Sequence, residues 1–292
     1  MLRDSKGLKI TLLAIVLIVM FINFLPGDTY PAKQEVVAST KDVYDLTVKA
    51  AGGDISVIVD PDATQISASY SGSGRTRSKL LLEQNGSSVT VSEKYSEKGF
   101  LHFFDFTSTP RMMVVVPQGA MLEALTVSTV SGDISIDSDL TADRIKLASA
   151  SGEIDFLNLK APGGTAQIAT VSGSIDGYSV AADKVKVATT SGGIDVYRVE
   201  GNDIDLNSVS GSISCETASD NGNVKLATVS GTIDMELDER TNATVSATSL
   251  SGSIQLGQSD SRSFEKSATA VVGNGTGSIN AKTTSGSITI SW

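Results

Sequence analysis

The 292-residue chain carries 33 Asp and Glu against 23 Lys and Arg, a formal net charge of -10. Because phosphate binding requires a basic surface, this balance argues against a nucleic-acid partner; the single cysteine, Cys215, also excludes an intrachain disulfide, and the single histidine, His102, excludes a His-rich metal centre. Only 5% of the residues are aromatic, whereas Ser, Thr, Val, Ile and Gly recur throughout, so the composition favours an all-β fold.

The amino terminus predicts a membrane anchor. Residues 8–25 form an apolar stretch just long enough for a spanning helix, basic residues precede it in the short tail 1–7, and Asp28 follows it. The positive-inside rule then places residues 1–7 in the cytoplasm and the bulk of the chain outside, in a single-pass protein of the cell membrane. A cleaved signal peptide is the alternative, for which residues 30–32 offer the best cleavage-like sequence. Residues 26–42 are expected to be a polar linker.

Residues 43–119 predict irregular coils or a cap. The segment Leu46–Val57 is a degenerate copy of the repeat described below, with two glycines in place of Ser-Gly, and three strand-like runs follow it. Solenoids need a cap that protects their terminal edge. Four phenylalanines in residues 100–106 belong either to this cap or to an exposed docking surface, and we favour the cap. His102 lies in the same stretch and is expected to be a packed or surface residue.

The strongest signal is a Ser-Gly-x-Ile motif that recurs eight times in residues 120–292. The first seven copies are 19 to 21 residues apart, and the eighth follows after 34. A fixed period in this range is typical of a solenoid, in which each coil buries its apolar face against its neighbours. We therefore expect a single-stranded, right-handed β-helix with coils of about 20 residues. Its structural repeat residues are Gly132, Ile134, Gly152, Ile154, Gly173, Ile175, Gly192, Ile194, Gly211, Ile213, Gly231, Ile233, Gly252, Ile254, Gly286 and Ile288.

Side-chain alternation predicts which positions of each coil face inward. The repeat isoleucine and the residue two positions later share one face of a strand, so both are expected in the core, and Cys215 falls in the second of these columns. A Ser or Thr always stands two residues before the repeat serine, and such hydroxyls can hydrogen-bond along the column. The repeat glycine is expected to form a tight corner between two strands.

The carboxy-terminal part departs from the regular spacing. Residues 257–277 are expected to be a loop inserted into the penultimate coil, more often neutral than functional. The last coil ends on an apolar strand and Trp292, with no charged residue after Lys282. An open end of this kind could pair with another chain, which makes a self-assembling envelope scaffold one alternative for the function.

An acidic column follows the repeat isoleucine and faces solvent. It holds Asp155, Asp176 and Asp195 on three successive coils, and stacked carboxylates are suitable ligands for Ca²⁺ or Mg²⁺. We take these three residues as weak metal candidates, because plain surface charge explains them as well. The preceding strands carry outward basic residues, so neighbouring faces are expected to differ in sign; these residues are Arg144, Lys146, Lys184, Lys186 and Lys225. No catalytic or cofactor-binding motif is present, and no cofactor is predicted.

The hydrophobic amino terminus, the run from Val114 through Val-Pro to Ile136, and the serial Ser-Gly-x-Ile coils together resemble the DUF4097 family of β-strand-repeat, adhesin-like proteins. The resemblance covers about residues 43–292. It implies a bacterial extracytoplasmic β-helix and supplies no catalytic residues. The layout of tail, anchor and one domain also resembles LiaG-type membrane-anchored proteins, which are encoded with envelope-stress systems.

The sequence thus favours a non-enzymatic surface protein of the bacterial cell envelope, adhesin-like or structural. Its expected partners are the membrane and an envelope protein or cell-wall polymer. A polysaccharide-active β-helix enzyme is the second alternative beside the scaffold, because β-helices also carry lyases and hydrolases. Coils held to 19 to 21 residues leave little chain for the long cleft-forming loops of such enzymes.

Overall fold

The computed structural model describes residues 30–31, 33–38, 43–71, 75–76, 78–95, 111–217, 222–257 and 266–292. The expected tail 1–7, the expected anchor 8–25 and the aromatic stretch 100–106 lie outside these ranges. Among the residues that are described, no helix has the length and apolarity needed to span a membrane.

The regular structure of the described residues consists of β-strands, which confirms the all-β expectation. The first nine strands are β1 Tyr30–Pro31, β2 Gln34–Val37, β3 Asp45–Lys49, β4 Asp54–Asp60, β5 Ser67–Ser71, β6 Arg75–Thr76, β7 Ser78–Asn85, β8 Ser88–Tyr95 and β9 Arg111–Pro117. The others are β10 Leu122–Thr129, β11 Ile134–Ser149, β12 Ile154–Thr170, β13 Ile175–Thr189, β14 Ile194–Glu200, β15 Asp203–Ser208, β16 Ile213–Thr217, β17 Asn223–Ser230, β18 Ile233–Leu237, β19 Ala243–Ser251, β20 Ile254–Leu256, β21 Ser267–Val272, β22 Gly277–Ser285 and β23 Ile288–Ser291.

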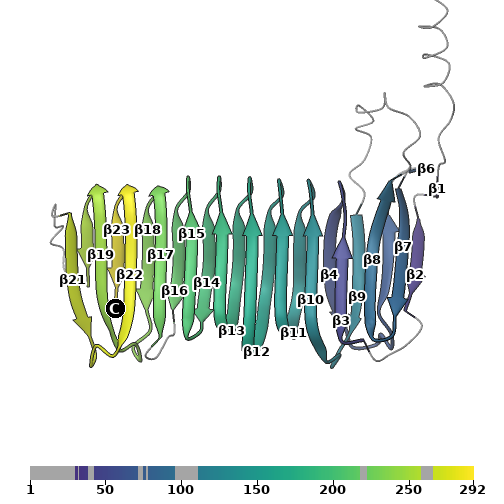
Figure 1. Ribbon diagram of the computed structural model, residues 1–292, viewed down its shortest axis with the longest axis horizontal. Coiled ribbons are helices and arrows are strands. Elements are labelled where there is room, and N and C mark those ends of the chain that lie inside the picture. The colour runs from purple at the N-terminus through teal and green to yellow at the C-terminus, as the bar shows by residue number, and fades with distance from the viewer. Residues whose placement is uncertain are drawn as a thin grey trace, which may run out of the picture.

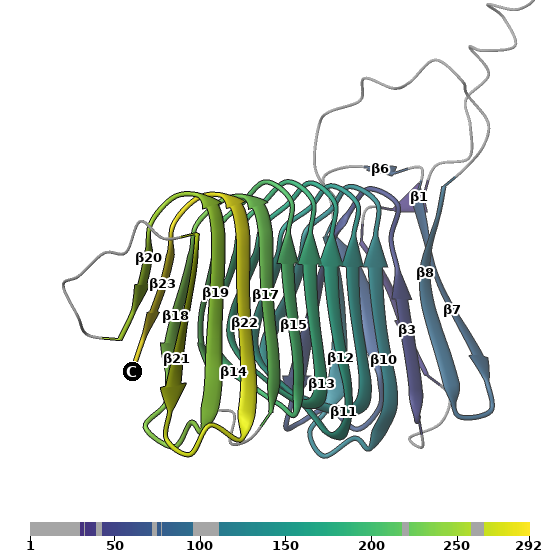
Figure 2. The ribbon, with the colours of Figure 1, turned by 60° about the vertical axis from the view of Figure 1, so that its left-hand side comes forward.

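The strands stack coil upon coil along one long axis (Figures 1 and 2). All except β1 and β6 belong to a single 21-stranded sheet, which winds around a continuous core. We call the strands that lead into the Ser-Gly turn the first face, as in β10, β15 and β17, and the strands that start at the repeat isoleucine the second face, as in β14, β16 and β18. Strands β11, β12 and β13 bend from the second face into the first. The expected right-handed sense of the coils stays a prediction.

The repeat isoleucines form the centre of the core. Parallel pairing places Ile154 beside Ile175, and Ile175 beside Ile194, without a shift in register. All eight repeat isoleucines have at most 1% of their surface exposed. Because identical side chains recur at one strand spacing, each buries its methyl groups between the residue above and the residue below.

The repeat glycines are required by the stacking of the coils, more than by the corner that the sequence suggested. A Cβ atom on Gly192 would lie 2.0 Å from the carbonyl oxygen of Gly173 in the preceding coil, and Gly211 meets Gly192 in the same way at 1.9 Å. No side chain fits at such distances, so any other residue here would push two coils apart.

The buried hydroxyl column is bonded to backbone. Thr170 donates to the carbonyl oxygen of Gly152 at 3.0 Å, Thr189 to that of Gly173 at 2.9 Å, and Ser208 to that of Gly192 at 2.9 Å. The hydroxyls therefore satisfy the carbonyl groups of the neighbouring glycine turn, whereas the sequence suggested bonds along the hydroxyl column. Each bond ties one coil to the next at the glycine turn.

The amino-terminal coil lies inside the stack. Strands β3 and β4 pair in parallel with β10 and β11 on one side and with β8 and β9 on the other, which confirms that Leu46–Val57 is a copy of the repeat. Beyond them, β7, β5 and β2 add antiparallel strands that cover the end. Strand β2, Gln34–Val37, falls within the expected linker 26–42, which is therefore strand in part, because its backbone completes the edge at β5.

The carboxy-terminal coil is also internal. Strand β22 lies between β17 and β19, and β23 lies between β18 and β20, so the last coil of the sequence fills a place one coil before the end. Strand β21, Ser267–Val272, covers β19 in antiparallel pairing. The expected loop insertion 257–277 is thus strand in part. It precedes β22, which lies between β17 and β19. The expectation of an open edge at the chain end is wrong, because β23 has a partner on both sides.

Candidate functional site: an acidic groove beside stacked tyrosines

Neighbouring coils bring the acidic column together on the second face. Asp155 of β12 pairs with Asp176 of β13, which pairs with Asp195 of β14. Each aspartate lies between two inward positions of its strand, so its side chain points away from the core. The structure therefore places the three sequence-predicted candidates side by side.

A shallow groove runs beside this column. Its volume is about 570 Å³, and its lining joins the three aspartates and Asp137 to apolar and aromatic residues. These are Phe156, Leu157, Gly177, Tyr178 and Tyr197. The groove therefore combines four carboxyl groups with an aromatic surface, and its lining contains no Lys or Arg.

Two tyrosines form the aromatic surface. The rings of Tyr178 and Tyr197 stack at a centroid distance of 5.3 Å with an interplanar angle of 17°, and 55% of each residue is exposed. Gly177, the one glycine of its inward column, makes room for the Phe156 ring, since a Cβ there would lie 2.1 Å from a ring atom. Apolar groups thus extend from the core to the groove.

A second hollow of about 230 Å³ continues the groove past Tyr197. It is lined by Asp195, Glu216, Asp234 and Glu236 among others, again without Lys or Arg. Arg198 of β14 lies beside Glu216 of β16 in the parallel pairing, and the two side chains form an ion pair at 3.2 Å. Tyr197 and Asp195 line both hollows, so the acidic region extends from β11 to β18.

The carboxylates are crowded enough to change their protonation. The pKa of Asp155 is raised to about 6, first by burial and then by the charges of Glu153, Asp176, Asp133 and Asp137. The pKa of Asp176 is also raised, by burial first and then by a hydrogen bond with the Glu153 carboxyl. The folded protein therefore holds these protons more tightly than the unfolded chain does, and positive charge in the groove would relieve the repulsion.

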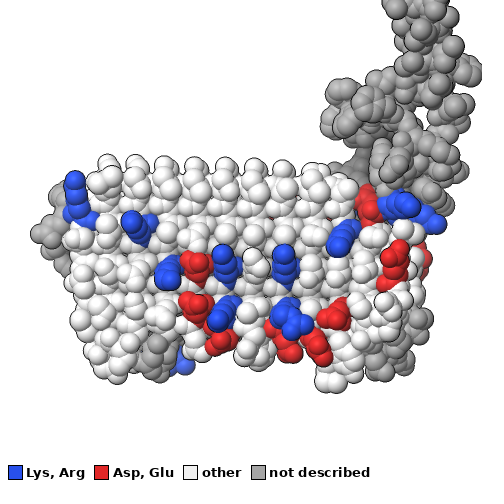
Figure 3. Space-filling view, in the orientation of Figure 1, with Lys and Arg blue, Asp and Glu red and all other residues white. Residues whose placement is uncertain are grey.

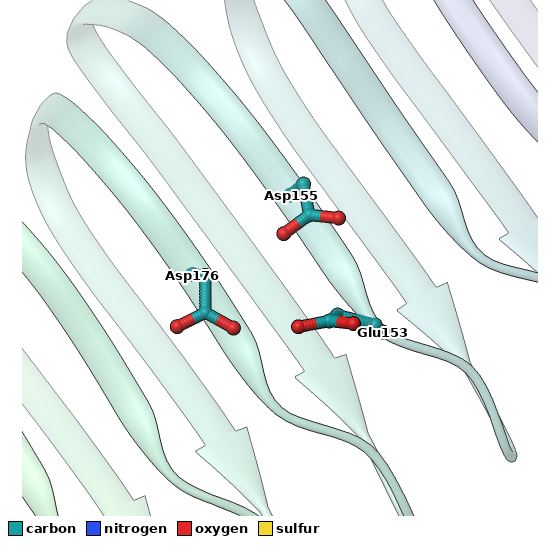
Figure 4. Close-up of side chains that lie close together, drawn as sticks. All are labelled: Glu153, Asp155 and Asp176. Atoms are coloured by element: carbon teal, nitrogen blue, oxygen red, sulfur yellow. The ribbon is translucent and has the colours of Figure 1, made fainter.

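Three carboxylates converge closely enough to share a metal ion, but they are not the expected three. Oxygens of Glu153, Asp155 and Asp176 all lie within 4.8 Å of one another (Figure 4). The third carboxylate of the trio is Glu153 and not Asp195. Residues 153 and 155 lie on the same face of one coil, whereas Asp195 is two coils away from Asp155. Hard oxygen ligands from a single side suit weak binding of Ca²⁺ at most.

Sequence reasoning missed the tyrosines, and it did not count Glu153 among the metal candidates. Leu157, Tyr178 and Tyr197 each follow the acidic column by two residues, so they share its outward face. An aromatic residue at this repeat position on two successive coils was the signal that could have identified them.

The first face differs from the expectation that it is basic. Lys186 of β13 pairs with Asp205 of β15, which pairs with Lys225 of β17, and Lys184 pairs with Asp203. Figure 3 shows Lys, Arg, Asp and Glu intermixed across this face, beneath an uncharged row of turns. Opposite charges are neighbours on several coils of this face, whereas the lining of the groove on the second face contains carboxylates and no Lys or Arg.

Of the remaining chemical candidates, Cys215 is a core residue. Burial raises the pKa of the Cys215 thiol to about 12, so it remains neutral in the core, as the sequence indicated. His102 lies outside the described residues.

A calcium titration tests the carboxylate trio. At about pH 7 in EDTA, Asp176→Asn should raise the melting temperature of the full-length chain, because it removes one of the repelling charges. The gain should shrink as the pH falls through the raised pKa of Asp176, and it should vanish below the ordinary value of 3.8, where the unsubstituted carboxyl is protonated in both states. Millimolar Ca²⁺ should raise the melting temperature of the unsubstituted chain and leave that of the variant unchanged. Asp205→Asn on the first face is the matched control. Equal melting temperatures of the unsubstituted chain and Asp176→Asn, with EDTA and with Ca²⁺, would show that the three carboxylates are ordinary surface charges that bind no metal ion.

Residues 45–291 match the sequence profile of the DUF4097 Toastrack family. The chain belongs to this family. The Toastrack match spans both faces of the solenoid and the whole groove. No curated protein matches the chain.

Among solved structures, this Toastrack chain is similar to a "putative adhesin" from Bacteroides fragilis, at 14% identity and a TM-score of 0.49, over 89% of this chain and 98% of the other. A "putative lipid binding protein" from Parabacteroides distasonis matches at 15% identity and a TM-score of 0.43, over 91% and 98%. A "putative cell adhesion protein" from Clostridium sporogenes matches at 11% identity and a TM-score of 0.28, over 90% and 99%.

Proposed function

We propose that this protein is a non-enzymatic interaction protein of the bacterial cell envelope. Residues 8–25 anchor it in the membrane as a single pass with the amino terminus in the cytoplasm, and the solenoid presents its faces outside the cell. The groove carries the proposal: in-register coils hold four carboxyl groups and two stacked tyrosines on a rigid, exposed surface. An open surface of this kind suits an extended partner better than a small molecule enclosed on all sides.

The geometry of the carboxylates favours binding over glycoside chemistry. A glycosidase directs an acid and a second carboxylate at a bond held between them. Asp155, Asp176 and Asp195 instead stand in one line on one wall, each next to its counterpart on the following coil. This arrangement supports recognition, and the polysaccharide-active alternative has no comparable observation in its favour.

Self-assembly through open solenoid ends is disfavoured by the strands that cap most of the described sheet ends. Antiparallel strands β2 and β7 cap both faces at the amino-terminal end, and β21 caps the first face at the other end, whereas β20, the last described strand of the second face, pairs in parallel with β23. Antiparallel caps stop the parallel stacking that would add another coil. An adhesin-like role for one molecule therefore fits the fold better than a filament.

The topology is tested by protease treatment of intact cells whose outer face is accessible. Residues after about position 32 should be digested, while a fragment containing residues 8–25 stays with the membrane. An epitope tag at each end of the chain identifies the two products by immunoblot. Full-length protein released into the medium without its amino terminus would show a cleaved signal, and protection of the whole chain would reverse the proposed orientation.

A further inference from the structure

We propose that the groove binds an arginine-bearing segment of a partner polypeptide in an extended conformation. The chemistry of binding is read from the groove itself, and only the location of the partner outside the cell rests on the proposed function.

The charge of the groove selects a cationic occupant. The two hollows are lined by seven carboxyl groups: Asp137, Asp155, Asp176, Asp195, Glu216, Asp234 and Glu236. Of these, Glu216 is already paired with Arg198. The linings of the two hollows contain no Lys or Arg to balance the remaining carboxyl groups, so an incoming positive charge gains favourable interactions with several of them. Polyanions such as phosphate-bearing polymers are repelled.

The length of the acidic region favours a chain over a single ion. Its carboxyl groups lie on six successive coils, β11, β12, β13, β14, β16 and β18, which at about 4.8 Å per strand spacing extend over about 24 Å. One metal ion contacts ligands within about 2.6 Å, and the carboxyl groups of the described residues that lie close enough together to share such an ion are those of Glu153, Asp155 and Asp176. An extended peptide of about eight residues matches the whole length, at about 3.3 Å per residue.

The tyrosines distinguish arginine from lysine. Tyr178 and Tyr197 stand beside the carboxylates, and Tyr197 lines both hollows. A guanidinium group can stack on a tyrosine ring and donate two parallel hydrogen bonds to a neighbouring carboxylate, whereas an ammonium group is a strongly hydrated point charge. A surface that offers rings and carboxylates side by side therefore suits arginine better. A neutral glycan would use the rings but would gain little from the carboxylates.

The test measures binding of an eight-residue peptide, acetyl-(Arg-Gly)₄-amide, to the full-length chain in neutral detergent with EDTA present. We expect binding that weakens as salt is raised from about 50 to 200 mM, weaker binding when Lys replaces Arg, and no binding when citrulline, an uncharged analogue of the same shape, replaces Arg. The variant Asp155→Asn/Asp176→Asn/Asp195→Asn should lose about tenfold or more in affinity. The variant Tyr178→Leu/Tyr197→Leu keeps apolar bulk and should lose roughly tenfold.

The matched control is Asp143→Asn/Asp203→Asn/Asp205→Asn, which removes the same charge from the first face and should change the affinity less than about twofold. All substituted side chains are outward, so the melting temperature of each variant serves to verify folding. Equal peptide affinity in both triple variants would overturn the proposal, as would equal binding of the citrulline peptide. Tighter binding of a neutral chitin oligosaccharide than of the arginine peptide would assign the groove to glycans. If the protease test fails while peptide binding is intact, the proposed location outside the cell is wrong and the proposed binding site in the groove still stands.

Discussion

Replacing Ile194 by Asp should destabilise the folded solenoid by about 5 kcal/mol, the sum of a lost buried side chain and an unpaired buried charge. Ile194 is 1% exposed and packs in the core column between Ile175 and Ile213. A carboxylate there has no partner in the column and separates two coils that stabilise each other. In a chain of this size the melting temperature should fall by about 10 °C or more. Thermal denaturation of the full-length chain followed by circular dichroism measures the effect.

Gln167→Asp is the matched control, because it introduces the same side chain on the exposed first face. Residue 167 pairs with Lys146 on one side and Lys186 on the other, so the new charge should be neutral or slightly stabilising. A melting temperature for Ile194→Asp within about 2 °C of the unsubstituted chain would show that the isoleucine column does not face the core, since smaller shifts are typical of surface changes.

The interior of the fold was predictable because a strand has only two sides. Once the repeat isoleucine is inward, the residue after it is outward and the next is inward again, as the buried Ile194, the exposed Asp195 and the buried Val196 show. The same alternation placed the three aspartates in one line. It also placed Cys215 in the core, where burial keeps the thiol neutral.

The order of the coils was not predictable from the same pattern. Every coil presents nearly identical apolar columns, so β19 could stack on β17 as well as β22 does, and the pattern contains no information on which coil lies next to which. The 34-residue spacing before Gly286 was the only sign in the sequence that β19 leaves room beside β17 and that β22 later fills it. Such long-range pairing depends on the length of the connection and on the antiparallel cap β21, neither of which belongs to the repeat.

The site shows the same limit on a smaller scale. Sequence spacing placed Asp195 with Asp155 and Asp176, but three residues on three coils extend over two strand spacings, and the convergent carboxylate comes from Glu153 of the same coil as Asp155. The tyrosine stack depends on two neighbouring coils adopting compatible side-chain directions, which a single coil does not reveal. The pattern thus predicted a charged surface, and only the packing of adjacent coils turned it into a groove.

Engineered disulfides should establish the coil order directly. In a Cys215→Ala background, Lys225→Cys/Asn280→Cys should oxidise to a disulfide, because β17 and β22 pair these two residues and paired strands lie about 4.8 Å apart, within the range for a disulfide. Lys225→Cys/Ser246→Cys should remain reduced, because β22 lies between β17 and β19 and separates these positions by about 9.6 Å. Titration of free thiols by mass spectrometry distinguishes the two results.

Ser246→Cys/Asn280→Cys serves as the positive control, because these residues are paired whether the last coil is inserted or simply follows its predecessor. Stacking in sequence order would reverse the other two results, since β19 would then lie beside β17 and β22 would lie one place farther away. All three variants use outward positions of the first face, so the comparison changes no core contact. Oxidation of Lys225→Cys/Ser246→Cys, together with a reduced Lys225→Cys/Asn280→Cys pair, would return the carboxy-terminal coil to the open end of the solenoid and restore the edge through which a second chain could pair.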